Sequence, residues 1–299
     1  MAKKIYVHFS GGLGNQLFTF ASSLAISLKR SQKMIILDTW YTGVQRGSSY
    51  EKHRRTFNLF ELEPIKETFL QANWLEKKII ALIEKVHFSK GIDLRKFGIQ
   101  IVDGDKIDTN TLVKNPKILY GYMQEPTNFS EIREIILNYI KLPKSQQTEI
   151  ENEIAKFRLG KKRLIAVHVR RGDYAHPDSF GCLLTPEYFR NALTRFDLED
   201  AAVLVFSDTP EWCQSDSFLN QFHVIKEESA TKSLIMMSLC DHFVLSASTF
   251  SWWAAWLSES DKKEVIVPNP YNEFDDSVWS QLVMPGWKKE ESIFETRSI

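Results

Sequence analysis

Short apolar runs alternate with amphipathic helical stretches along this chain, and that alternation limits the folds open to it. Residues 5–9 form an apolar run that leads into a glycine-containing loop, and apolar side chains then recur at helical spacing over residues 16–29. Residues 34–38 are a second apolar run, as expected of a strand buried in a parallel sheet. This order predicts a βαβ unit and an α/β fold. Further along, we predict a strand at 117–122 and helices at 73–86 and 128–142.

The same alternation restarts in the second half. We predict a helix over the charged stretch 144–162, ending near Gly160, and place a domain boundary there because few apolar residues bind this stretch to either core. Strands are predicted at residues 164–169, 201–206, 224–225, 243–245 and 265–267, with helices at 186–196, 230–239 and 250–257. The sequence therefore predicts two doubly wound parallel-sheet domains, residues 1–160 and 161–299, that face each other across a ligand-binding cleft.

Charge excludes several classes of partner. The 299 residues carry 38 Lys+Arg and 38 Asp+Glu, a formal net charge of zero, so no global field attracts the protein to nucleic acid or to an anionic membrane. Any anionic ligand must therefore be held by a local site. No run of about 18 or more apolar residues predicts a membrane span, and His8 with the glycines after it interrupts any signal-peptide core. We predict a cytoplasmic protein.

Signatures of metal and cofactor sites are missing. Asp103-Gly104-Asp105 matches an Asp-x-Asp metal pair, but the same letters make an ordinary turn. The histidines form no His-x-x-x-His pair, and the sequence has no phosphate-binding P-loop. The cysteines lack the spacing of a zinc site or a disulfide framework and are predicted to be reduced thiols: Cys182, Cys213 and Cys240. We expect neither a metal nor a cofactor.

The first loop, Gly11-Gly12-Leu13-Gly14-Asn15-Gln16, lies between a predicted strand and a predicted helix. Backbone amides at such a position can hold an anion or a polar ligand. The loop is not the dinucleotide fingerprint, because Leu17 stands at the third glycine position. A tight turn with Asn15 as the helix cap explains the same spacing, so both interpretations stay open on these residues alone.

A basic motif, VHVRRGDY at residues 167–174, follows the apolar strand of the second half. Ligands bind at the carboxyl ends of such strands. His168 and Arg170 point to one face and Arg171 to the other, so one arginine can face a ligand while its neighbour pairs with a carboxylate. Arginine is suited to bidentate contact with phosphate. A surface arginine pair bound to Asp173, worth about 0–1 kcal/mol, is the alternative.

Two further strand ends carry polar side chains. Asp208 can accept hydrogen bonds from a base edge such as that of guanine, or it can cap the following helix. The sequence SASTFS at residues 246–251 opens a helix, where hydroxyls and free amides make a phosphate cradle. The aromatic side chains of that helix are predicted to pack in the core: Trp252, Trp253 and Trp256.

Four blocks in order carry a resemblance to a known family: GGLGNQLFTFA (11–21), VHVRRGDY (167–174), FSDTPEWC (206–213) and CDHFVLSASTFSWWAAWL (240–257). With these blocks the sequence resembles the α-1,2-fucosyltransferases of glycosyltransferase family 11, over nearly the whole chain. The second block is shared with other fucosyltransferases, so it indicates the donor more than the acceptor. The last block narrows the resemblance to this family.

The resemblance implies a GT-B architecture of two facing Rossmann-like domains. It implies that GDP-fucose binds mainly to the C-terminal domain and that the N-terminal domain takes the acceptor. Fucose would pass with inversion, and without a metal, to the 2-hydroxyl of a terminal β-galactoside on an oligosaccharide or a glycolipid-linked glycan.

The resemblance also implies roles for individual residues. Arg170 would contact the β-phosphate of the donor, and His168 and Asp208 would lie beside the guanine. Asn15 would reach across the cleft toward the sugar or the acceptor. The remaining residues of the donor site would be those of the glycine loop and of the helix start: Gly12, Gly14, Ser248, Thr249, Phe250 and Ser251.

Several points stay open. The general base is Asp173 or Asp178 in our hypothesis, unless deprotonation comes late. The region 40–114 is predicted to shape the acceptor subsite, with Trp40, Tyr41 and Arg54 as candidates that ordinary packing explains equally well. The alternatives are a transferase with another GDP-sugar or acceptor, including a protein O-fucosyltransferase, a non-catalytic nucleotide-sugar or glycan-binding protein, and a regulatory Rossmann protein.

Overall fold

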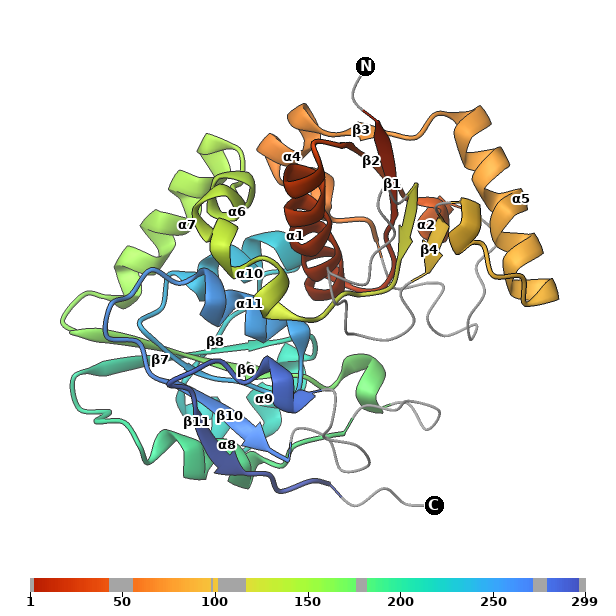
Figure 1. Cartoon of the computed structure of the whole chain (residues 1–299). Coiled ribbons are helices and arrows are strands. Elements are labelled where there is room, and N and C mark those ends of the chain that lie inside the picture. Colours follow the sequence, from red (N-terminus) through yellow and green to blue (C-terminus); the bar gives the residue numbers. More distant parts are fainter. Residues whose placement is uncertain are drawn as a thin grey trace. The chain divides into compact units, whose positions relative to one another are not determined.

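The structure is a computed structural model that describes residues 3–42, 56–97, 99–101, 117–175, 182–270 and 279–295 (Figure 1). The chain divides into two compact units, Met1–Lys141 and Leu142–Ile299. In the residues that the structure describes, each unit contains one sheet in which every pair of neighbouring strands is parallel. The predicted α/β class with two parallel sheets is therefore confirmed.

The N-terminal unit has a five-stranded sheet in the order β3-β2-β1-β5-β4. Its strands are β1 (Lys4–His8), β2 (Lys33–Leu37), β3 (Leu70–Gln71), β4 (Ile99–Ile101) and β5 (Ile118–Tyr120). Its helices are α1 (Leu13–Arg30), α2 (Thr39–Thr42), α4 (Glu63–Thr68), α5 (Trp74–Lys90) and α6 (Arg133–Tyr139), with short 3-10 turns η1 (Leu59–Glu61), η2 (Arg95–Phe97), η3 (Pro126–Asn128) and η4 (Ser130–Ile132).

Helix α1 shows why this unit folds as the pattern predicts. Its apolar side chains recur three or four residues apart, which places them on one face, and Leu17, Phe20 and Leu24 are buried. The helix begins at Leu13, three residues before the predicted start. The predicted helix 128–142 is instead two 3-10 turns followed by the short α6, because Phe129, with φ −135° and ψ −1°, leaves the helical region.

The C-terminal unit has a six-stranded sheet in the order β11-β10-β9-β6-β7-β8. Its strands are β6 (Arg163–Val169), β7 (Ala201–Ser207), β8 (His223–Val224), β9 (His242–Val244), β10 (Val265–Asn269) and β11 (Lys288–Glu291). Its helices are α7 (Lys144–Phe157), α8 (Pro186–Leu193), α9 (Pro210–Ser215), α10 (Ala230–Ser238) and α11 (Thr249–Leu257), with 3-10 turns η5 (Gly172–Ala175), η6 (Leu219–Gln221) and η7 (Trp279–Leu282).

Counted from its own first strand, this sheet has the order of a dinucleotide-binding Rossmann fold. The chain builds the sheet outward from β6 in one direction and then returns to add β9 on the other side of it. The adjacent strands β6 and β9 therefore form the point where the order reverses. Ligands of open α/β sheets bind outside the carboxyl ends of the strands at such a point.

The division between the units differs from the predicted boundary near Gly160, because α7 belongs to the C-terminal unit. Ile150 and Ile154, one helical turn apart, are buried, and α7 packs against α10. Just beyond α7, Arg158 donates to both carboxylate oxygens of Asp241, at 2.8 and 3.0 Å. Glu149 of α7 also lies 3.2 Å from Nζ of Lys232 in α10, so two isoleucines and two ion pairs attach this otherwise polar helix to the C-terminal unit.

The core of the C-terminal unit contains the residues that the sequence assigns to it. Strand β6 is buried from its second residue to its last. The indoles of Trp252, Trp253 and Trp256 are at most 5 % exposed, which confirms their role in packing. The three cysteines, all of which the structure describes, are buried and form no disulfide. Among the residues that the structure describes, no helix combines the length and the apolar character that crossing a bilayer requires.

Candidate functional site

The candidate site of the C-terminal unit lies at the carboxyl ends of β6, β7 and β9, which are neighbours in the sheet. His168 is the sixth residue of β6 and Arg170 follows the strand, Asp208 follows β7, and Ser246 lies just beyond β9. The sheet thus brings together three stretches that the sequence singled out separately.

Arg170 lies between two carboxylates. Its Nη2 donates to Oδ1 of Asp173 at 2.5 Å, and its Nη1 lies 2.8 Å from Oδ2 of Asp208. Desolvation favours the neutral guanidine, but the charges of Asp208 and Asp173 outweigh it and raise the pKa of Arg170 above its ordinary value. About a quarter of the side chain is exposed. The alternative of an arginine pair bound to Asp173 holds for Arg170 only, because Arg171 has another partner, and the contact of Arg170 with phosphate stays a prediction.

Asp208 holds the backbone of the loop after β6. Its Oδ1 accepts hydrogen bonds from the amides of Arg171 and Gly172, at 2.9 and 3.2 Å. A side chain at Gly172 would bring its Cβ within 2.3 Å of Oδ2 of Asp208, so only glycine allows this approach. The capping alternative for Asp208 is wrong: Thr209 is the N-cap of α9, and no side chain caps it. The contact with guanine stays a prediction.

Arg171 turns away from Arg170 toward the end of the chain. Its guanidinium forms a two-fold ion pair with Glu295, in which Nη2 lies 3.0 Å from Oε2, and its Cζ lies 3.8 Å from the ring centroid of Trp212. Two backbone hydrogen bonds hold the residues around Glu295: the amide of Thr185 donates to the carbonyl of Ile293, and the amide of Glu295 donates to the carbonyl of Leu183. Glu295 was not predicted as a site residue, since no motif marks it.

His168 is buried at the point where the strand order reverses. Its Nδ1 lies 2.7 Å from the hydroxyl of Ser246, across the boundary between β6 and β9. Burial, with a smaller effect of the Arg170 charge, lowers the pKa of His168 to about 3. The imidazole is therefore neutral at physiological pH and joins the two strand ends. A place for it beside guanine stays a prediction.

Helix α11 points its N-terminus at the same edge of the sheet. Ser248 is the N-cap, and its hydroxyl accepts from the amide of Phe250 at 3.3 Å. The hydroxyl of Ser251 is turned inward to the carbonyl of Ser248, at 3.1 Å. Thr249 and Phe250 are partly exposed. Tyr174 donates to the carbonyl of Ala247 at 3.0 Å, so the loop after β6 is attached to the start of α11.

The glycine loop is the corresponding feature of the N-terminal unit. Gly11 has φ +77°, and a Cβ there would lie 2.7 Å from Nδ2 of Asn15. Gly12 is the N-cap of α1, so the interpretation of Asn15 as the cap is wrong. Asn15 lies in the first turn of the helix instead, and its Oδ1 accepts from Nε2 of Gln124 at 2.9 Å. Gly14 is buried in the same turn.

Gln16, which was not predicted as a site residue, holds this loop in place. Its side chain is fully buried. Its Nε2 donates to the carbonyls of Gly11 and Thr56, and its Oε1 accepts from the amide of Asn58. Tyr41, a candidate for the acceptor subsite, donates to the same Gly11 carbonyl at 2.7 Å, which is a packing role.

Other predicted residues lie outside the described part of the chain: Arg54, Asp103, Asp105 and Asp178. Among the described residues, no group of three or more His, Cys, Asp or Glu side chains is placed to hold a metal ion.

Solved structures of fucosyltransferases share the fold. A mutant of Arabidopsis thaliana FUT1 in complex with GDP superposes with a TM-score of 0.53 at 14% identity and covers 89% of this chain and 70% of that one. NodZ α-1,6-fucosyltransferase soaked with GDP-fucose gives 0.52 at 18% identity, over 86% and 93% of the two chains. At these identities the likeness shows the fold alone, and it confirms the predicted fold class.

Three relatives show the extent of the similarity in sequence. The O-antigen biosynthesis glycosyltransferase WbnK of Escherichia coli is 27% identical over 95% of this chain and 99% of its own. An α-1,2-colitosyltransferase of Escherichia coli is 24% identical over 91% and 93%. Galactoside α-(1,2)-fucosyltransferase 1 of Saimiri boliviensis boliviensis is 28% identical over 48% of this chain and 43% of its own.

The family pattern spans both units. The sequence model of glycosyl transferase family 11 matches residues 4–291, from β1 to the end of β11. The glycine loop, the basic motif and the serine-rich start of α11 all lie inside the match. The chain belongs to glycosyl transferase family 11.

Proposed function

We propose that the protein transfers L-fucose from GDP-fucose to the 2-hydroxyl of a terminal β-galactoside on a glycan, with inversion at the anomeric carbon and without a metal. The observation that carries this proposal is the place of Arg170, whose guanidinium is held by Asp173 and Asp208 at the carboxyl edge of the sheet. The N-terminus of α11 points to the same edge.

The chemistry requires a positive group at this edge. The acceptor oxygen forms a bond to C1 of fucose, the bond from C1 to the β-phosphate oxygen breaks, GDP leaves with the electron pair, and the acceptor hydroxyl loses its proton. Negative charge therefore grows on the β-phosphate. A guanidinium already fixed in direction, together with the amides and the dipole of a helix N-terminus, stabilises that charge without reorganising.

The two carboxylates give Arg170 a defined direction before the donor binds. Asp208 sets the loop backbone and one side of the guanidinium, and Asp173 sets the other. A diphosphate that approached the exposed part of the side chain would meet a fixed pair of N–H donors. The planar guanidinium matches a phosphate in two hydrogen bonds, which an ammonium group does not.

The general base remains a choice between carboxylates. Asp173 is bound to Arg170, while Asp178 lies outside the described residues. If Asp173 only positions the arginine, Asp173→Asn lowers kcat by the same factor at every pH. If it accepts the proton, the variant also loses the acidic limb of the pH profile of kcat. An unchanged profile and solvent isotope effect in both Asp173→Asn and Asp178→Asn would exclude both carboxylates.

The linkage and the acceptor rest on the relatives. Two of them carry an α-1,2 linkage in their names, and one of these acts on galactosides. Purified protein incubated with labelled GDP-fucose, EDTA and a panel of galactosides tests the whole proposal. We expect a product that resists α-1,3- and α-1,4-specific fucosidases and is cleaved by an α-1,2-specific one. Donor binding without turnover across the panel would favour a non-catalytic binding protein.

A second donor is supported by one observation. The relative named α-1,2-colitosyltransferase matches 91% of this chain, whereas the galactoside fucosyltransferase matches 48%. Colitose is L-fucose without its 3-hydroxyl, so both donors present the same diphosphate to Arg170. Competition between GDP-fucose and GDP-colitose decides between them: the proposed function requires the larger kcat/KM for GDP-fucose.

A further inference from the structure

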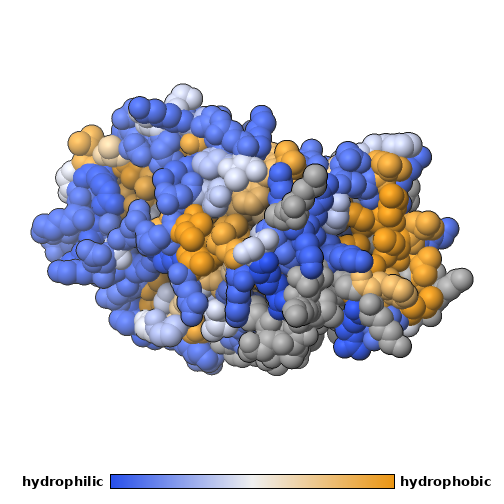
Figure 2. All heavy atoms as spheres, turned by 45° about the horizontal axis from the view of Figure 1, so that its top comes forward, coloured by the Kyte–Doolittle hydropathy of each residue, from blue (hydrophilic) through white to orange (hydrophobic). Residues whose placement is uncertain are grey.

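One face of α5 leaves large apolar side chains in solvent. Trp74, Leu75, Ile79 and Leu82 are 68, 58, 51 and 63 % exposed. In the described residues, six of the eleven exposed large apolar side chains lie within residues 74–97. Figure 2 shows the same concentration as a continuous apolar band over the part of the N-terminal unit formed by α5. We call Trp74, Leu75, Lys78, Ile79, Leu82 and Lys85 the α5 surface.

Lysines alternate with the apolar side chains on this face. Successive residues of a helix turn by about 100°, so Trp74, Lys78, Leu82 and Lys85 follow one another along the helix. The Nζ of Lys78 lies 4.0 Å from the ring centroid of Trp74. An amphipathic aromatic ring beside a lysine whose stem covers apolar surface is the arrangement found at membrane interfaces.

The opposite face of α5 attaches it to the sheet. Ile80 is buried in the core of the N-terminal unit and Ile83 packs against that core. At the first turn, Glu76 accepts from the hydroxyl of Tyr6 at 2.6 Å and from Nζ of Lys4 at 2.8 Å. The helix is therefore firmly placed, and its apolar outer face is not a consequence of loose docking.

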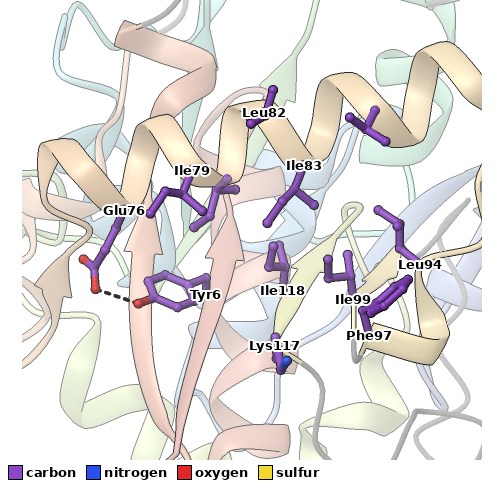
Figure 3. Close-up of a pocket in the computed structure, with 12 residues that line it drawn as sticks. Tyr6, Glu76, Ile79, Leu82, Ile83, Leu94, Phe97, Ile99, Lys117 and Ile118 are labelled. Carbon is purple, nitrogen blue, oxygen red and sulfur yellow. Dashed lines mark hydrogen bonds between the residues drawn. The ribbon is translucent and has the colours of Figure 1, made fainter.

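An apolar groove of about 530 Å³ lies below the helix (Figure 3). Ile83 points into it from α5, Ile99 and Ile118 come from the strands, and Leu94 and Phe97 close one side. Phe97 is itself 62 % exposed, so apolar surface continues from the groove to solvent. Its volume falls in the range of about 300–1,000 Å³ typical of ligand pockets.

Local charge distinguishes between two candidate partners of this surface, a second copy of the chain and an anionic bilayer. Residues 74–97 contain six Lys or Arg and three Asp or Glu, a net charge of +3 in a chain whose total is zero. Glu76 and Asp93 are bound by Lys4 and Arg95 of this same unit, and Lys77 is bound by Asp38, which leaves Lys78 and Lys85 as the lysines of the α5 surface. A second copy of the chain would bring another basic surface against this one, which opposes self-association. Anionic lipid headgroups complement the lysines, and acyl chains complement the apolar side chains.

We infer that the α5 surface binds the protein to an anionic lipid bilayer, with α5 lying in the plane of the interface and its exposed apolar side chains among the acyl chains. The inference is independent of the donor and the acceptor of the proposed reaction. The zero net charge of the whole chain conceals this site, because the basic surface is balanced by acidic residues elsewhere.

Cosedimentation of the full chain with vesicles tests the inference. We expect binding to vesicles of equal parts phosphatidylglycerol and phosphatidylcholine, and much weaker binding to phosphatidylcholine alone. Lys78→Gln with Lys85→Gln removes two charges that contribute about fivefold each and lowers binding to the anionic vesicles on the order of 25-fold. Leu75→Ser with Leu82→Ser lowers binding to both kinds of vesicle, by at least about tenfold.

Matched controls lie in the C-terminal unit. Leu159 is 80 % exposed, and Lys161 and Lys162 are exposed, so Leu159→Ser and Lys161→Gln with Lys162→Gln remove the same kinds of group from another place. We expect both controls to bind like the parent. All variants should keep the parent's transfer rate on a soluble acceptor, which separates this test from that of the proposed function.

Three results would overturn the inference. The first is no binding to anionic vesicles at physiological salt. The second is an equal loss in the α5 variants and the matched controls, which would mean general electrostatic adsorption. The third is a dimer in light scattering that the leucine variants dissociate, together with no vesicle binding, which would assign the surface to a second copy of the chain.

Discussion

Arg170 and Asp208 join the ends of two neighbouring strands through an ion pair, with Nη1 of the arginine 2.8 Å from Oδ2 of the aspartate. The same carboxylate accepts the amides of Arg171 and Gly172 through its other oxygen. One side chain thus sets both the backbone and the guanidinium of the loop after β6. The arginine is held in place by structure that exists before any donor binds.

Under the proposed function, the geometry of this guanidinium is required for turnover. We expect Arg170→Lys to lower kcat at least about a hundredfold, the usual cost of one lost preorganised donor. The lysine keeps the charge but cannot contact Asp173, Asp208 and a phosphate in fixed directions. Steady-state kinetics with GDP-fucose checks the effect, and circular dichroism checks that the variant is folded.

The matched control for this variant is Arg195→Lys. Arg195 is ion-paired with Glu290 at 2.6 Å but lies at the surface. It should keep the parent rate. Near-normal turnover in Arg170→Lys would show that the β-phosphate is stabilised by another group.

The two adjacent glycines before α1 should respond differently to alanine. Gly11 combines φ +77° with a Cβ position 2.7 Å from Asn15, so Gly11→Ala costs about 1–3 kcal/mol of backbone strain and also displaces Asn15. Gly12 is extended, with φ −76°, and a Cβ there meets no atom within 4 Å. Gly12→Ala should therefore cost less than about 1 kcal/mol. Thermal unfolding of the two variants compares them, and equal melting temperatures would contradict the geometry of the loop.

The protein should become less stable as the pH is lowered, because of His168. Burial, together with the Arg170 charge, lowers the pKa of His168 to about 3 from its ordinary value of 6.5. Between these two values the unfolded chain binds a proton that the folded chain excludes. The free energy of unfolding therefore decreases as the pH falls below about 6.5, by about 1.4 kcal/mol per pH unit. The loss at pH 5 is about 2 kcal/mol from this residue.

Urea unfolding at pH 7.5 and pH 5 measures this effect. Asparagine can still bond the Ser246 hydroxyl but does not titrate, so His168→Asn should lose about 2 kcal/mol less than the parent between the two pH values. The same pH dependence in both proteins would mean that the imidazole is not buried in the neutral form.

Much of the fold could be predicted because the strands that form its centre are apolar and short. Residues of β1, β2, β6 and β7 read as buried strands from sequence alone. Three of the four edge strands in the described residues were not predicted: β3 has two residues, β4 has three, and β11 is Lys288–Glu291, whose letters KKEE carry no apolar pattern. The fourth, β8, overlaps the predicted strand 224–225. Their pairing depends on neighbours that are distant in the sequence.

The position of the candidate site in the fold could be predicted from the sequence, but the partners of its charged side chains could not. A strand end with an arginine block indicates where a ligand binds, and Arg170, His168 and Ser248 do meet at one edge. The partners of each charge depend on the sheet order, which places Asp208 beside Arg170 and brings Glu295 to Arg171. Neither contact can be predicted from a local sequence pattern, because the paired residues are far apart in the chain. For the same reason the charge total could not reveal the local basic surface of α5.

Glu295 provides the last prediction, since it is connected to the loop that carries Arg170 only through Arg171. Its carboxylate holds the guanidinium of Arg171, which also stacks on Trp212. The backbone amide of Arg171 donates to Asp208. Glu295→Gln keeps the shape of the side chain and removes the charge. A hydrogen bond to a charged group contributes about 1.5–3 kcal/mol, so we expect kcat/KM for GDP-fucose to fall about tenfold through displacement of the Arg170 loop.

The measurement must separate positioning from general loss of stability. Glu290→Gln removes a similar ion pair, to Arg195, from the same part of the chain, and it should leave kcat/KM unchanged. Glu295→Asp shortens the side chain but keeps the charge, and we expect it to recover part of the lost rate. A decrease shared equally by Glu295→Gln and Glu290→Gln would show that the C-terminal segment supports only the fold, whereas a loss confined to Glu295→Gln, with an unchanged melting temperature, makes Glu295 a positioning residue for Arg170.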